Sequence, residues 1–159
     1  MKQVTLAKWL KLITIGIALC GLVVYCFLIP GYGGSIASNY PEFAYCYVPW
    51  LVFLSLTAIP CYIALFLAWK IFDNIGKDRS FCLENAKYLK WISWLAAGDS
   101  AYFFIGDLVL LFLNMNHPGI VLYSLIVVFA GVAISVASAA LSHLVRKAAL
   151  LQEESDLTV

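Results

Sequence analysis

Charged residues are scarce in this chain, because lysine, arginine, aspartate and glutamate together make up 12% of its 159 residues. Soluble domains carry about twice that share. The scarcity excludes a water-soluble globular domain, a disordered chain and a basic protein that binds nucleic acid directly. Cysteine is sparse too, and the five cysteines are too scattered for a disulfide scaffold.

Motifs that carry chemistry are also missing from the sequence. It has no glycine-rich phosphate loop, no zinc-binding His-Glu-x-x-His helix and no Gly-x-Ser-x-Gly nucleophile turn. We therefore expect no catalytic residue, no cofactor and no metal site, and the sequence argues against an enzyme.

What the chain has instead is apolar sequence, which accounts for 64% of its residues. A helix that crosses the roughly 30 Å hydrocarbon core of a bilayer needs about 20 mostly apolar residues. Four stretches qualify, at residues 12–29, 48–69, 91–113 and 119–142. The sequence thus predicts an all-α integral membrane protein, a single domain over residues 1–159 with four transmembrane helices in one bundle.

The basic residues predict the orientation of these spans. All ten lysines and arginines precede the first span, separate the second from the third, or follow the fourth. Because such residues stay on the cytoplasmic side, both termini should be cytoplasmic in a multi-pass cell-membrane protein. A cleaved signal peptide is the competing interpretation of the first span, since Ser35-Ile36-Ala37 loosely resembles a cleavage site. Its apolar run is longer than that interpretation favours.

Residues 30–47 are expected to form an outer loop rich in aromatic side chains. Aromatic rings with one polar end suit the membrane interface, so we expect this loop to lie on the outer leaflet. Glycines and prolines in the segment favour a loop over a helix. Cys26 and Cys46 are close enough to this rim for a disulfide to be considered.

Residues 70–90 are predicted to form a cytoplasmic helical stalk, in which Gly76 ends one helix in the left-handed conformation and Ser80 caps the next. The stalk carries five basic and three acidic residues among aromatic ones. It can be an interfacial belt against anionic lipid or a docking surface for a soluble partner. The mixed charge makes lipid binding alone an incomplete explanation. The docking residues would be Lys77, Arg79, Phe81, Glu84, Asn85 and Lys87.

Two acids, Asp99 and Asp107, lie within the third span. A mid-membrane Asp costs about 2.5–3.5 kcal/mol on insertion scales, so neither should face lipid. They lie about 12 Å apart along the helix and point about 80° apart, which excludes a carboxylate dyad. By depth we expect Ser135 and Ser138 near Asp99, and Tyr123 or Ser124 near Asp107. The acids either join helices or form a site for a proton, a cation or a polar ligand.

The fourth span carries small residues at helical spacing, Gly131, Ser135 and Ala139, and again Ser138 and Ser142. Such a ridge permits close helix packing. It is expected to lie inside the bundle, and a homodimer face is the second interpretation.

The stalk also carries a resemblance. Ile75-Gly76, Phe81, Glu84-Asn85 and Leu89, followed by Trp91-Ile92, resemble the bacterial membrane-protein family described as domain of unknown function 2975. Ser80-Phe81-Cys82 departs from its usual Pro-Phe-Ser, which removes a hydroxyl cap at position 82.

The resemblance implies a protein without assigned enzyme activity. Family members often occur beside a small helix-turn-helix regulator, so it implies a membrane-held regulator whose partners are the bilayer and a cytoplasmic transcription factor. The alternative from the residues is a small transporter or sensor that uses Asp99 and Asp107.

Overall fold

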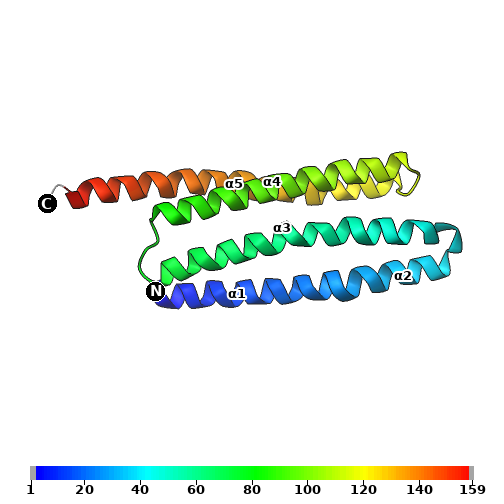
Figure 1. Ribbon diagram of the computed structural model, residues 1–159, viewed down its shortest axis with the longest axis horizontal. Coiled ribbons are helices and arrows are strands. Elements are labelled where there is room, and N and C mark those ends of the chain that lie inside the picture. The colour runs from blue at the N-terminus through cyan, green and yellow to red at the C-terminus, as the bar shows by residue number, and fades with distance from the viewer. Residues whose placement is uncertain (1–2, 158–159) are drawn as a thin grey trace.

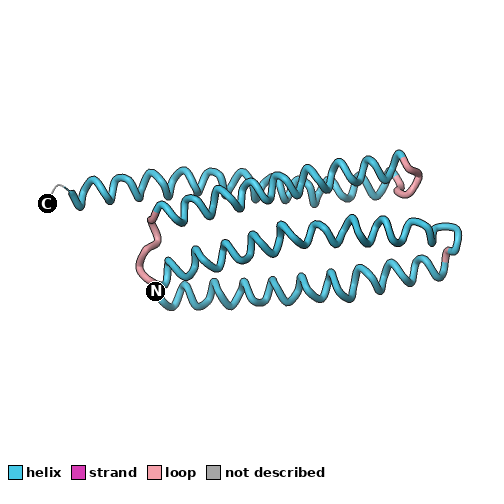
Figure 2. The backbone as a smooth tube through the Cα atoms, viewed as in Figure 1, coloured by secondary structure: helices cyan, strands magenta, loops and turns pink. Residues whose placement is uncertain are grey.

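The computed structural model describes residues 3–157, which form helices and connecting turns without any strand in that range (Figures 1 and 2). The first long helical rod consists of α1 (Gln3–Val23), the π-helical segment η1 (Val24–Leu28) and α2 (Ile29–Asn39). A 3-10 turn, η2 (Pro41–Phe43), leads into the second rod. The other rods are α3 (Ala44–Gly76), α4 (Leu83–Phe112) and α5 (Pro118–Leu157).

Each of the four rods is long and apolar enough to cross a membrane. Their most apolar stretches are at most 17% buried within the protein, and large apolar side chains such as Phe112 and Phe129 are 82% and 75% exposed. Lipid must cover such surfaces, because exposing them to water forfeits the hydrophobic stabilisation. The predicted all-α fold with four membrane-spanning helices is confirmed.

The rods pack in chain order. Helices α1 and α2 pack on α3, α3 packs on α4, and α4 packs on α5. Within the described residues, helices further apart in this order do not pack closely on each other. Figure 1 shows two long hairpins lying side by side. We call the end with the start of α1, the α3–α4 turn and the end of α5 the basic end, and the opposite end the cation-free end.

Small residues bring α4 and α5 together. A side chain on Gly131 would collide with the Ser100 hydroxyl of α4, and the Ser142 hydroxyl donates a 2.6 Å hydrogen bond to the Ala86 carbonyl. The ridge on α5 therefore packs inside the protein, against α4.

The expected outer loop at residues 30–47 is mostly helical instead. The first rod continues to Asn39, and α3 already begins at Ala44. A helix satisfies its own backbone hydrogen bonds, which outweighs loop propensity where lipid replaces water. Gly33 also allows α2 to pack tightly on α3, because a Cβ there would lie 2.9 Å from the Tyr47 ring. All five cysteines are free, so Cys26 and Cys46 do not pair.

The α3–α4 turn also differs from expectation. Gly76 ends α3, but the left-handed residue is Asp78, with φ 61°. Ser80 does not cap α4, which follows the extended residue Cys82; its hydroxyl donates instead to Gln3 Oε1 at 3.0 Å. Packing of the turn against α1 has redirected this side chain.

Candidate functional site

Asp107 is fully buried between α4, the α4–α5 turn and α5. The Ser124 hydroxyl donates to Asp107 Oδ2, which confirms one expected partner. Asn116 Nδ2 donates to Asp107 Oδ1 at 2.7 Å, a partner that spacing alone did not reveal because the turn folds back. Both carboxylate oxygens are thus satisfied, and Asp107 joins the α4–α5 hairpin at its cation-free end.

Asp99 faces α3 rather than α5. Its carboxylate accepts a hydrogen bond from the Cys61 thiol at 3.7 Å. Ser135 bonds to Ser93 instead, and Ser138 is buried on α5, which packs on α4 alone among the described helices. The expected pairing of Asp99 with these serines is wrong. The angle between the two acids around the axis of α4 directs Asp99 towards α3, while Asp107 faces α5.

A row of polar side chains continues from Asp99 across α3 to the first rod. The Tyr25 and Thr57 hydroxyls lie 2.9 Å apart, and Thr57 precedes Cys61 by one helical turn. Tyr25 lies in η1, a π-helical segment, and such segments occur frequently at functional sites. Four polar side chains from three rods therefore lie together in the middle of the apolar region.

Charged side chains gather at the basic end. Asp73 accepts hydrogen bonds from Lys11 and Lys77, both at 2.7 Å. These two bonds lower the pKa of the Asp73 carboxyl, outside the predicted span, to about 2. Arg79 and Glu84 lie 3.8 Å apart. Exposed ion pairs such as Arg79–Glu84 contribute little stability, so Arg79 stays available to a partner.

A recess of about 530 Å³ opens at the basic end. We call it the basic-end recess; its walls are the α3–α4 turn from Asp78 to Leu83, Gln3 of α1, and Ala149, Gln152 and Glu153 of α5. Phe81 and Leu83 remain 58% and 42% exposed there. Charged and apolar groups are thus presented together on one concave surface.

The predicted docking residues divide into two groups. Arg79 and Phe81 line the basic-end recess, and Lys77, Glu84 and Lys87 are exposed around the same end. Asn85 is 1% exposed and donates to the Arg79 and Ser80 carbonyls at 3.2 and 3.0 Å. Asn85 therefore shapes the turn from inside and is not on the surface where we expected it.

Sequence reasoning missed the contribution of α5, whose last part was treated as a tail. The helix runs to Leu157, and Figure 1 shows it extending past the start of α4. One signal was present, because no glycine or proline follows Gly131 to end the helix.

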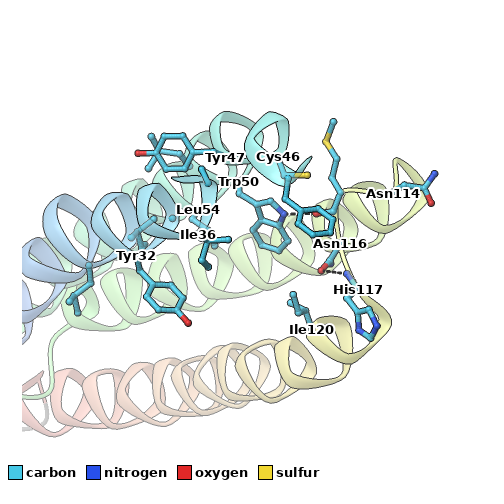
Figure 3. Close-up of a pocket in the computed structure, with 17 residues that line it drawn as sticks. Tyr32, Ile36, Cys46, Tyr47, Trp50, Leu54, Asn114, Asn116, His117 and Ile120 are labelled. Atoms are coloured by element: carbon cyan, nitrogen blue, oxygen red, sulfur yellow. Dashed lines mark hydrogen bonds between the residues drawn. The ribbon is translucent and has the colours of Figure 1, made fainter. Parts of the chain in front are cut away.

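A second, larger cavity of about 820 Å³ lies at the cation-free end. Figure 3 shows side chains from α2 (Tyr32, Ile36), α3 (Trp50, Leu54) and the start of α5 (Ile120) around it. This cavity could not be predicted from the sequence, because its walls come from segments far apart in the chain.

The arrangement of possible metal ligands gives no evidence for a metal site among the described residues. Within the part of the chain that the structure describes, no three histidine, cysteine, aspartate or glutamate side chains group as a metal site.

Four apolar rods, a carboxylate buried between α4 and α5 and basic residues confined to one end define a multi-pass helical membrane protein. Comparison with known proteins agrees. The family described as "Protein of unknown function (DUF2975)" matches residues 31–159, and the chain belongs to this family.

One curated relative is the uncharacterized membrane protein YoaS of Bacillus subtilis (strain 168). It is 32% identical over 152 residues, which cover 94% of each chain. No solved structure matches the chain. The resemblance first seen in the α3–α4 segment is thereby confirmed.

Proposed function

We propose that this chain is a non-enzymatic regulatory protein of the bacterial cell membrane that presents its basic end to a soluble cytoplasmic protein. The observation that carries the proposal is the exposed Phe81 beside the basic-end recess. A large aromatic side chain held at a concave, polar-rimmed surface is typical of an anchor for a protein partner.

The charge distribution supports a cytoplasmic location for this surface. Lys77 and Arg79 belong to it, and all ten basic residues lie outside the predicted spans on one side of the predicted topology. Bacterial loops with such an excess of cations remain in the cytoplasm. A partner at the basic end is therefore a cytoplasmic protein.

The exposed residues around the recess also indicate what the partner should look like. Exposed Lys77 and Lys87 favour acidic side chains on the partner, and Phe81 with Leu83 favours an apolar patch beside them. A small helix-turn-helix regulator is the class that the family resemblance suggests. Binding at the membrane would hold such a regulator away from DNA.

A photocrosslinking experiment tests this proposal. p-Benzoylphenylalanine replaces Phe81 in the full chain in its native host, and Phe112 serves as the matched control because it is an exposed phenylalanine at the other end of α4. We expect a single adduct with a helix-turn-helix protein from position 81 and none from position 112. Combined Lys77→Glu, Arg79→Glu and Lys87→Glu should reduce that adduct at least tenfold.

Equal adducts at both positions, or lipid adducts alone at position 81, would overturn the proposal. The second of these outcomes would favour the interfacial-belt interpretation of the same residues.

A second candidate function rests on Asp99. Among the described residues, the Asp99 carboxylate bonds to the Cys61 thiol, a weak donor, and it ends a row of polar side chains that leads through Cys61 towards Tyr25. This arrangement favours a small transporter or sensor for a proton or cation. In liposomes, Asp99→Asn should then abolish proton or Na⁺ flux but leave the Phe81 adduct unchanged in cells.

A further inference from the structure

The cavity at the cation-free end combines features of a ligand site. Its volume of about 820 Å³ falls within the roughly 300–1,000 Å³ typical of small-molecule sites. Among the described residues that line it, none is aspartate, glutamate, lysine or arginine. Its chemistry is therefore that of an apolar chamber.

Fixed contacts hold this chamber open. Trp50 Nε1 donates a 2.7 Å hydrogen bond to the Met115 carbonyl, and Tyr45 donates at 3.2 Å to the Asn114 carbonyl. These bonds tie α3 to the α4–α5 turn at the end of the molecule. The buried Asp107 holds the same turn through Asn116. The chamber is thus pre-formed rather than dependent on a ligand to shape it.

Both α2 and α5 contribute walls to the chamber. These two helices do not pack on each other within the described residues, and Tyr32 and Ile120 point into the space between them (Figure 3). Tyr32 is 74% exposed and Ile120 is 48% exposed. A ligand would therefore enter from the bilayer.

Polarity is graded along the chamber. Leu28, Leu51 and Leu54 lie within the predicted spans, whereas Asn116 and His117 lie in the turn outside them. His117 Nδ1 accepts from the Gly119 amide at 3.0 Å, so the neutral ring carries its proton on Nε2. The turn thus offers uncharged hydrogen-bonding groups, and the deeper part offers only apolar contact.

We propose that this chamber binds a membrane-dissolved amphiphile with one long acyl chain and an uncharged, hydrogen-bonding head, of the monoacylglycerol class. The acyl chain lies among the leucines and the head lies at the α4–α5 turn. A phosphate or carboxylate head is disfavoured, because a desolvated anion needs a cation beside it and the chamber supplies none. This inference is independent of the function proposed for the basic end.

Photolabelling tests the inference on the full chain in phosphatidylcholine nanodiscs. The probe is a monoacylglycerol with a diazirine midway along its acyl chain. We expect saturable labelling that maps by mass spectrometry to residues 28–54 and 114–120. Excess monooleoylglycerol should abolish the labelling, whereas equal amounts of oleate or dioleoylphosphatidylglycerol should reduce it less than twofold.

Two variants fill the chamber and one matched variant does not. Leu54→Trp and Ile120→Trp place a larger ring in the chamber and should each reduce labelling at least tenfold. Leu122→Trp makes a similar change two residues along α5, at a 68% exposed position outside the chamber, and should leave labelling unchanged. Circular dichroism and elution volume confirm that each variant is folded.

Four results would overturn the inference. Three of them are labelling that does not saturate, equal labelling of the Ile120→Trp and Leu122→Trp variants, and equal competition by the anionic amphiphiles. Labelling that appears only when the protein is diluted from dimer to monomer would instead assign the chamber to a second copy of the chain, and would overturn it too.

Discussion

The Asn74 side-chain amide donates a 2.8 Å hydrogen bond to Asn85 Oδ1, joining the last turn of α3 to the first turn of α4. Asn85 uses its own amide to bind two carbonyls of the intervening turn. One buried side chain therefore fixes the turn that forms much of the basic-end recess.

Replacing Asn85 should destabilise the protein strongly, because its side chain is buried and bonds to three groups. Asn85→Ala leaves Asn74 and two turn carbonyls without their partner, and each buried polar group left unsatisfied costs about 1–3 kcal/mol. Thermal unfolding in detergent should show a clearly lower Tm. Asn39→Ala removes an exposed asparagine with one 3.4 Å bond and should change Tm little. Similar Tm values for the two variants would contradict this role.

Gly106 should tolerate no side chain, because a Cβ there would collide with the ring of Phe53. That ring is buried and stacks on Phe103 at 5.4 Å, so it cannot move aside. Gly106→Ala should destabilise the protein by about 1–3 kcal/mol through overpacking. Gly16→Ala, which meets nothing within 4 Å, should instead stabilise by up to about 1 kcal/mol of helix propensity. Chemical unfolding in mixed micelles measures the change in the free energy of unfolding for each variant.

Stability should depend on pH through Asp73. The folded-state pKa of about 2 lies below the roughly 3.9 of an unfolded aspartate, so ionised Asp73 stabilises the folded state above pH 4. That contribution is lost as the pH falls towards 2. Asp73→Asn should therefore lower Tm at pH 6 and lose less Tm between pH 4 and pH 2 than the wild type. Parallel Tm curves would show that the Lys11 and Lys77 contacts contribute nothing.

The orientation can be measured with a membrane-impermeant maleimide. In a chain whose native cysteines are replaced, Ser38→Cys at the cation-free end should be labelled on intact spheroplasts. A chain that retains Cys82 alone, in the α3–α4 turn, should be labelled only after permeabilisation. The reverse pattern would place the basic end outside and remove the proposed cytoplasmic partner.

Much of the architecture could be predicted because it follows from the order of apolar and polar residues along the chain. Apolar runs of sufficient length form helices in lipid, because their backbone N–H and C=O groups find no other hydrogen-bond partner there. Ser124 was found as a partner of Asp107 because matched depth in an antiparallel hairpin is a sufficient guide. Asn116 was not found, because the path of a turn is not encoded in helical spacing.

The direction in which the Asp99 side chain points could not be predicted from helical spacing either. Spacing along α4 predicted the angle between Asp99 and Asp107, but the helix that each acid faces depends on how α3 and α5 are placed around α4. The helices pack in chain order, so Asp99 meets Cys61 of α3 and Asp107 meets Ser124 of α5.

The sequence by itself determined the class of protein, the four spans and the end that carries the cations, since hydropathy and charge act locally along the chain. The tertiary structure alone decided the two concave surfaces. The basic-end recess needs Phe81 beside Ala149, and the chamber needs Tyr32 opposite Ile120. Such neighbours are brought together by the packing of whole helices, which depends on small residues and side-chain volumes at each crossing.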